Sequence, residues 1–176
     1  MPKRDYIDFQ DRSTPVAYLI SFRGYGTWLH GDGRGSMDRA NFNTYGGPKI
    51  PANPKLKESD RSQLKFPPFE LTAIIRKPVK NAIKEICDTR GIRLYAFNIR
   101  TEHVHTVVSA GRDPERIMND FKAYATRHLR KAGLVGVEQK IWSRHGSTPW
   151  LWTDRHIEQA IDYVLYGQGD DLPEFD

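Results

Sequence analysis

The order of the apolar patterns along the chain is the feature that most constrains its fold. Residues 16–22 read as a buried strand, because the segment VAYLISF is short and apolar and lies between Pro15 and Gly24. Two further strand-like segments, 92–100 and 103–109, are joined by a short polar link and predict an antiparallel hairpin. A central strand and a hairpin beside it are therefore expected.

Two segments of helical periodicity surround this hairpin. The first begins at Pro78, behind a shorter helical turn at 71–77, and ends at Gly91. The second begins at Pro114 and ends at Gly133. Each is expected to bury one apolar stripe, made of Val79, Ala82, Ile83, Ile86 and Cys87 in the first helix and of Ile117, Met118, Phe121, Ala125, His128 and Leu129 in the second.

The C-terminal part completes the order β-α-β-β-α-β and adds a helix. Residues 140–146 are the best candidate for a fourth strand, and Thr153 is a plausible N-cap for a helix over 154–167. We therefore predict an α+β, ferredoxin-like (split βαβ) fold, an antiparallel sheet with two helices on one face, followed by the C-terminal helix. That last helix is expected to bury Ile157, Ala160, Ile161, Val164 and Leu165.

Length and composition favour one domain over residues 1–176. Residues 24–68 are rich in glycine and proline and show little periodicity, which indicates a long loop insertion with at most short helical turns. The content of 38% hydrophobic and 28% charged residues excludes both a disordered chain and a membrane protein. Because no segment resembles a membrane span or a signal peptide, a cytosolic protein is expected.

Charge and cysteine content narrow the chemistry further. The formal net charge of +5 favours a polyanionic partner or a basic surface patch. Since Cys87 is the only cysteine, an intramolecular disulfide and a Cys-rich zinc site are both excluded. A bound metal would need His, carboxylate or amide ligands.

Three side chains could carry chemistry. His103 and His105 project from the same face of a predicted strand, with Cα atoms about 6.6 Å apart, so both imidazoles can converge on one cation. The alternative is that one histidine packs in the core and the other lies at the surface. Tyr163 lies at the border of the apolar stripe of the last helix, where its hydroxyl can turn toward a neighbouring surface or its ring can simply rim the core.

The spaced combination of these residues resembles the single-tyrosine HUH transposases, and within them the REP-associated tyrosine transposases and their transposase-like relatives. The resemblance runs from Tyr18 to Gln168 and is interrupted by residues 24–68. Its landmarks are His103-Val104-His105 at the end of an Ala-Phe-x-Ile strand, the basic helix FKAYATRHLRK, the segment Ile-Trp-Ser-Arg, and IDYV followed by Gln168.

The resemblance implies that His103 and His105 are ligands of a Mg²⁺ or Mn²⁺ ion and that Tyr163 is the nucleophile. A phenol with a pKa of about 10 is mostly protonated at neutral pH, and a divalent cation or basic neighbours can favour its phenolate. Attack on DNA would release a 3′-hydroxyl and leave a 5′-phosphotyrosine, which another 3′-hydroxyl can reverse. The implied function is metal-dependent cleavage and transfer of single-stranded hairpin or palindromic repeat DNA.

The third metal ligand departs from the pattern of the family. Relatives place an amide four residues after the tyrosine, whereas this chain has Gly167 there and Gln168 one residue later. Gln168 would reach the metal if the chain unwinds at Gly167 in the left-handed conformation. Asp170 is a second candidate, and the alternative is that both are solvated tail residues. Residues 100–102 also differ from the Pro-Asn that many relatives have before the first histidine.

Tyr124 is the competing nucleophile, since it also lies on a helix close to basic residues. In the resembled family the corresponding helix packs on the sheet and contacts DNA, so Tyr163 is preferred. Basic residues and the tryptophans at 142, 150 and 152 fit phosphate neutralisation and base stacking, although solvated helix faces explain many charges equally well. The expected DNA contacts are Arg34, Lys122, Arg127, Arg130, Lys131 and Arg144.

Several alternatives stay open. The glycine-rich motif YGTWLHGDGRGS, residues 25–36, could close over a nucleic acid strand or cover the edge of the sheet. A domesticated, ferredoxin-like nucleic-acid-binding module that does not cleave is the second functional hypothesis, and a nonspecific metallophosphoesterase is the third. A homodimer is also possible, because related proteins build the site within one chain or by exchanging the terminal helix.

Overall fold

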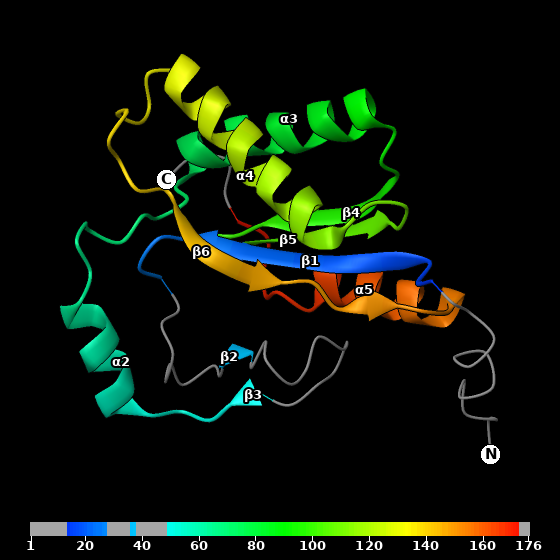
Figure 1. Ribbon diagram of the computed structural model, residues 1–176, viewed down its shortest axis with the longest axis horizontal. Coiled ribbons are helices and arrows are strands. Elements are labelled where there is room, and N and C mark those ends of the chain that lie inside the picture. The colour runs from blue at the N-terminus through cyan, green and yellow to red at the C-terminus, as the bar shows by residue number, and fades with distance from the viewer. Residues whose placement is uncertain (1–13, 28–35, 38–48, 173–176) are drawn as a thin grey trace.

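The computed structural model describes residues 14–27, 36–37 and 49–172, and it centres on one antiparallel sheet (Figure 1). The strands lie in the order β4-β5-β1-β6, and a short strand, β7, also pairs with β1. Their bounds are Ala17–Gly24 for β1, Leu94–Ile99 for β4, His103–Ser109 for β5, Trp142–Ser147 for β6 and Trp150–Leu151 for β7. None of the helices in these ranges has the length and hydropathy needed to cross a membrane.

Three helices cover the two faces of this sheet (Figure 1). Helices α3 (Ala73–Arg90) and α4 (Pro114–Lys131) pack side by side on one face, and α5 (Asp154–Tyr166) packs on the other face, over β4 and β5. The antiparallel β4–β5 hairpin has Ile99 opposite Val104, and β1 pairs along the whole of β5. The predicted ferredoxin-like fold is therefore confirmed.

The alternation of side chains along β1 divides the core into two clusters. Ile20 and Phe22 point toward α3 and α4 and join the larger cluster, where the Phe22 ring packs edge-on against Trp142. Ala17 and Leu19 point toward α5 and join the smaller cluster. Burying each large apolar side chain stabilises the fold by about 1.5–3 kcal/mol, so both faces of β1 contribute to stability.

Cys87 belongs to the larger cluster and has no chemical role that the structure supports. Its side chain is buried on α3, and burial, together with the neighbouring Asp88 carboxylate, raises the pKa of the thiol to about 12. The thiol therefore stays protonated at neutral pH, which makes Cys87 a packing residue.

Helix α3 begins earlier than the sequence pattern predicts. It runs without interruption from Ala73, with Thr72 as the N-cap, so the predicted start at Pro78 is wrong. A proline inside a helix removes one backbone hydrogen bond and costs about 3 kcal/mol. Burial of Ile75 before the proline and of Val79 after it holds the helix together across this position. The helix ends as predicted, at Gly91 with a φ of 62°.

Helix α5 begins at the predicted cap, because the Thr153 side chain accepts a hydrogen bond from the backbone N–H of His156. Two expected core residues lie elsewhere. Leu165 is 41% exposed, and the side chains that the helix buries are Ile157, Ala160 and Val164. On α4, His128 lies outside the apolar cluster and pairs with Glu85 of α3 instead.

The segment 24–68 contains more regular structure than predicted. Helix α2 (Pro54–Ser62) has nine residues, and Asn53 caps it by accepting from the Leu56 N–H. It buries no side chain, which explains why the sequence shows no apolar stripe there. Two short strands, β2 (Ser36–Met37) and β3 (Lys49–Ile50), pair with each other. Most of the YGTWLHGDGRGS motif lies outside the described residues.

Candidate active site on the α5 face

His103 and His105 begin β5 and present their rings on the face covered by α5. The ring centroids are 4.6 Å apart, with the planes at 65°. His105 is 5% exposed, and its neighbour across the sheet on β1 is Ser21. Side chains alternate along a β-strand, so both imidazoles lie on one side of the sheet, as the sequence pattern predicts. The pairing of β5 with β1 holds His105 opposite Ser21.

Each imidazole has a polar side chain at one ring nitrogen. Ser21 Oγ lies 2.5 Å from His105 Nδ1, and Gln168 Oε1 lies 3.3 Å from His103 Nε2. When His105 Nδ1–H donates to the serine hydroxyl, the ring lone pair is on Nε2, which is the form that binds a metal. His105 Nε2 is buried and makes no hydrogen bond to the described residues.

Tyr163 reaches this pair from the last turn of α5 in the same chain. Its ring lies 5.5 Å from the His105 ring, with the planes at 67°, and the residue is 36% exposed. Three rings, those of His103, His105 and Tyr163, thus form one row between β5 and α5.

Asn98 fixes α5 against the strand that carries this row. It is the β4 residue paired with His105, and its Nδ2 donates to the Val164 carbonyl at 2.9 Å. Val164 follows Tyr163 directly, so the hydrogen bond ties the tyrosine's helical turn to the hairpin. Asn98 and Ser21 were not among the residues that the sequence pattern identifies, although each is a polar residue in an apolar strand opposite His105.

Gln168 connects the tyrosine turn to the first histidine. Its Nε2 donates to the Tyr163 carbonyl at 3.0 Å while its Oε1 faces His103. The predicted left-handed conformation at Gly167 is wrong, because its φ is −89°, and the positive φ of 83° occurs at Gly169. The chain turns back beyond Gly167, and this brings Gln168 to the imidazoles while Asp170 is exposed.

The donor set at this site consists of two imidazoles and one amide oxygen. Within the described ranges, no group of three or more His, Cys, Asp or Glu side chains is arranged to hold a metal ion. The Gln168 amide oxygen is the oxygen donor that lies beside the imidazole pair, 3.3 Å from His103 Nε2. Imidazole nitrogens suit first-row transition-metal cations, and carbonyl-type oxygens suit Mg²⁺ and Mn²⁺.

Lys122 has a different position from the one predicted for a DNA contact. The side chain is 7% exposed, and its ammonium donates to the carbonyls of Ser143, Arg144 and His145 at 2.9, 3.4 and 3.2 Å. Trp142 is also buried, with its indole N–H donating to the Lys122 carbonyl. Both side chains join α4 to β6, and neither offers a surface to nucleic acid.

The buried Lys122 ammonium predicts a loss of stability on substitution. Replacing Lys122 by Met keeps the apolar stem and removes the donor to three carbonyls, so the free energy of unfolding should fall by about 1–3 kcal/mol. Urea unfolding monitored by circular dichroism measures this change. The exposed Lys131 provides the matched control, since Lys131→Met should stay within about 0.5 kcal/mol. Equal stability of the two variants would contradict the assignment.

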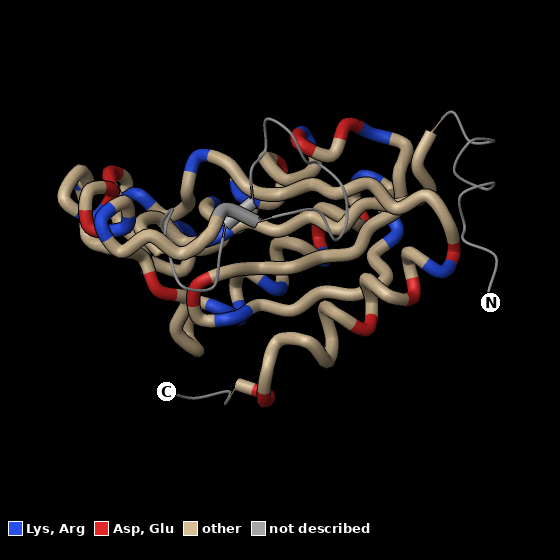
Figure 2. Tube along the Cα trace, turned by 90° about the horizontal axis from the view of Figure 1, so that it is seen from below, with Lys and Arg blue, Asp and Glu red and all other residues tan. Residues whose placement is uncertain are grey.

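The other predicted contacts are spread over several elements, as Figure 2 shows for Lys and Arg in general. The Arg127 guanidinium stacks 4.6 Å from the Tyr124 ring, and an Arg130 nitrogen donates to the Val137 carbonyl. Tyr124 packs against the larger core cluster, on the face opposite the histidines. Lys131 and Arg144 are exposed, and Arg34 lies outside the described residues.

Comparisons with known proteins agree with this architecture. A family model described as "Transposase IS200 like" matches residues 69–161, more than half of the chain. A solved structure, described as that of a REP-associated tyrosine transposase bound to a REP hairpin, aligns with a TM-score of 0.50 and 11% identity. The alignment covers 86% of this chain and 65% of the other, so this chain spans less than two thirds of that protein's length.

The structural likeness shows a shared fold, and the match to the family model shows membership. A search of curated proteins finds no match. The family model spans α3, the β4–β5 hairpin with both histidines, α4, β6 and most of α5. The chain belongs to the IS200-like transposase family.

Proposed function

We propose that this protein cleaves and rejoins single-stranded DNA at a hairpin or palindromic repeat, through a covalent bond between Tyr163 and a 5′-phosphate. The observation that carries the proposal is the row formed by His103, His105 and Tyr163 in one chain, with the Gln168 amide at its end. Membership of a transposase family supports a reaction on DNA. The REP hairpin in the related structure supports a folded single strand as the substrate class.

The donor set fits a divalent cation such as Mg²⁺ or Mn²⁺, held by His103, His105 and the Gln168 oxygen. An imidazole nitrogen and an amide oxygen 3.3 Å apart can share either a proton or a cation. Ser21 orients the His105 ring in the way that outer hydrogen bonds commonly orient metal-binding histidines. When bound, the cation supplies Lewis-acid polarisation of a phosphate oxygen.

Tyr163 would then act as the nucleophile. Its phenolic oxygen forms a bond to phosphorus as the bond from phosphorus to the 3′-oxygen breaks; the phenol gives up its proton and the 3′-oxygen takes one up. The product is a phosphodiester between Tyr163 and the 5′ end of the downstream fragment, and the upstream fragment leaves with a free 3′-hydroxyl. Attack by a different 3′-hydroxyl reverses the step and joins a new pair of strands, without an external energy source.

Polarity of the covalent product tests this proposal directly. A single-stranded hairpin substrate labelled at its 3′ end is incubated with the protein and Mn²⁺, then denatured and analysed by electrophoresis. We expect the 3′ label to migrate with the protein, and a 5′ label on the same substrate to be released on a shorter fragment. Retention of the 5′ label, or hydrolysis of either substrate without a protein adduct, would overturn the proposal. Binding without any cleavage would favour a non-cleaving module.

Gly167 should be required for the position of the tyrosine. A Cβ at this residue would lie 2.7 Å from the Tyr163 carbonyl oxygen and 3.1 Å from Cδ2 of its ring. Gly167→Ala must therefore displace the tyrosine turn, and we expect cleavage about tenfold to a hundredfold slower, because small misplacements of reacting groups have effects of this size.

Gly136 provides the matched control for this substitution, since a Cβ there meets open space. Gly136→Ala should cleave at the rate of the natural chain. The two variants are compared in single-turnover assays at saturating DNA, together with their thermal unfolding midpoints. Full activity of Gly167→Ala would show that the tyrosine turn tolerates the added methyl group.

A further inference from the structure

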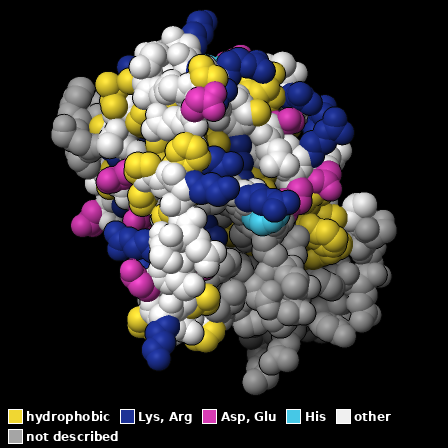
Figure 3. Space-filling view, turned by 60° about the vertical axis from the view of Figure 1, so that its left-hand side comes forward, with side chains coloured by type: hydrophobic (Ala, Val, Ile, Leu, Met, Phe, Trp, Pro, Cys, Tyr) yellow, Lys and Arg dark blue, Asp and Glu magenta, His cyan; other side chains and the backbone are white. Residues whose placement is uncertain are grey.

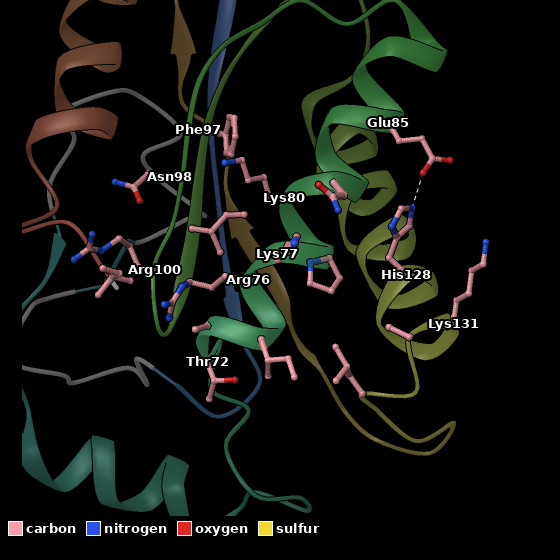
Figure 4. A pocket seen from close by; sticks show the side chains of 18 of the residues that line it. Thr72, Arg76, Lys77, Lys80, Glu85, Phe97, Asn98, Arg100, His128 and Lys131 are labelled. Atoms are coloured by element: carbon pink, nitrogen blue, oxygen red, sulfur yellow. Dashed lines mark hydrogen bonds and ion pairs between the residues drawn. The ribbon is translucent and has the colours of Figure 1, made fainter. Parts of the chain in front are cut away.

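We propose that a basic groove across α3 and the edge of β4 binds the single-stranded flank of the DNA whose phosphate lies at Tyr163. This inference rests on the proposed function and extends it to a surface on the other side of the sheet. We call this surface the α3 groove and define it by Lys77 and Lys80 of α3, Phe97 of β4, Arg100 after β4, and Arg127 and Lys131 of α4. Figure 4 shows Lys77, Lys80, Phe97, Arg100 and Lys131 around α3.

The exposed face of α3 carries a regular row of cations. Lys77, Lys80 and Lys84 are exposed and follow one another at intervals of three and four residues, which places them on one face of the helix. At a rise of 1.5 Å per residue, the row is about 10 Å long. A row of this kind can follow a charged backbone over more than one phosphate.

Phe97 gives the groove an aromatic surface beside the row. The half-buried ring lies at the outer strand of the sheet, and the ammonium groups of Lys80 and Lys84 stand 5.9 and 5.8 Å from its centroid. Sites for single-stranded nucleic acid combine cations that neutralise phosphates with aromatic side chains that contact bases. The pairing of a lysine row with an aromatic ring therefore favours a nucleic acid strand as the occupant.

The charge of the groove is strongly unbalanced. With Arg76, which also lines it, the groove has six Lys or Arg side chains and two acidic ones, Glu85 and Asp171, of which Glu85 already pairs with His128. Among the described residues, Lys77, Lys80 and Lys84 make no ion pair with a carboxylate. Figure 3 shows Lys and Arg side chains crossing one face of the molecule beside a histidine. The complementary partner is a polyanion.

The groove continues to the candidate active site at Arg100. The backbone N–H of Arg100 donates to the His103 carbonyl at 2.8 Å, so the residue lies in the turn that leads into the histidine pair. Its guanidinium lies 3.9 Å from the place that a Cβ at Gly169 would occupy, directly after Gln168. A strand whose phosphate reaches Tyr163 can therefore pass Arg100, cross the edge of β4 and follow the lysines of α3.

Paired substitutions of equal charge test the α3 groove. The test variant is Lys77→Gln with Lys80→Gln, and the control is Lys55→Gln with Arg61→Gln on α2, where both side chains are also exposed. Each pair lowers the net charge by two. Binding of a fluorescent hairpin with single-stranded flanks, and of the same hairpin without them, is measured by anisotropy over a range of salt concentrations.

We expect the test variant to bind the flanked hairpin about tenfold more weakly and the control variant to change it less than threefold. The salt dependence of the test variant should fall by about 1.4 in its log–log slope, because each phosphate contact on a single strand contributes about 0.7. Binding of the hairpin without flanks should be the same for the test variant and the natural chain. Equal losses in both variants, or equal losses with and without flanks, would overturn the proposal.

The assay separates this inference from the proposed function. At saturating DNA the test variant should still form the covalent adduct, since the substituted lysines do not touch the histidine and tyrosine row. Selective weakening of flank binding without any adduct in the natural chain would retain the groove and reject the proposed chemistry. An adduct in the natural chain with unchanged flank binding in the test variant would support the proposed chemistry and reject the α3 groove.

Discussion

Replacing Tyr163 by phenylalanine should abolish covalent attachment to DNA and lower strand cleavage by about a thousandfold or more. The substitution removes only the hydroxyl, and the ring can keep its place 5.5 Å from the His105 ring. A loss of this size would therefore come from the missing hydroxyl and not from a change in packing. Single-turnover cleavage of a labelled hairpin in Mn²⁺ measures it, and Mn²⁺ binding should be the same in both proteins.

Two other tyrosines provide matched controls for this result. Tyr166 lies one turn further along the same helix and is 78% exposed, and Tyr124 lies on α4 across the sheet from the histidines. Both Tyr166→Phe and Tyr124→Phe should cleave within about threefold of the natural chain, because each removes only a hydroxyl that lies away from the two histidines. Full cleavage by Tyr163→Phe together with loss in Tyr124→Phe would reverse the assignment of the nucleophile.

Replacing His105 by alanine should weaken Mn²⁺ binding about a hundredfold or more and abolish cleavage with it. Removing a residue that hydrogen-bonds to a metal ligand lowers metal affinity about tenfold to a hundredfold. Removing the ligand itself should lower the affinity at least as much. Isothermal titration with Mn²⁺ in the absence of DNA measures the affinity without reference to activity. The exposed His145 on β6 is the control, and His145→Ala should bind Mn²⁺ normally.

Unchanged Mn²⁺ affinity in His105→Ala would place the cation away from this histidine and contradict the assignment. Circular dichroism on the same samples distinguishes loss of a ligand from loss of fold, because His105 is 5% exposed in the sheet. A folded variant with no Mn²⁺ binding and no cleavage is the expected outcome.

The sequence alone predicts the features of this fold that depend on local periodicity. The β4–β5 hairpin and the common face of His103 and His105 follow from alternation within one strand, and the Thr153 cap follows from side-chain chemistry at a helix start. A local pattern is sufficient for these features because the residues that determine each of them lie within a few positions of one another in the sequence.

Features that depend on tertiary burial were not predictable in the same way. Pro78 has the local properties of a helix start, and only the burial of Ile75 shows that the helix begins before it. Lys122 is an instructive case, because it lies in helical phase with Met118, Ala125 and Leu129. That phase is a signal for burial, but the three carbonyls that make burial of an ammonium favourable come from β6.

The position of Gln168 depends on both kinds of information. The sequence shows an amide one residue later than the family pattern, and helix geometry by itself would turn it away from the histidines. In the structure Gln168 nevertheless reaches the histidines, because it lies beyond the end of the helix at Gly167. Its Nε2 donates to the Tyr163 carbonyl while its Oε1 faces His103. No local rule specifies such a turn.

The shallow docking of α5 has a consequence for how the reaction could proceed. This helix fully buries three side chains, whereas α3 and α4 bury seven each, so it should be the first of the three to detach in local opening events. If Tyr163 is the nucleophile, as proposed, it would lie on the most loosely anchored of these helices and could move with an attached DNA end while the larger core stays folded. Strand exchange would then require only a hinge movement at the C-terminus.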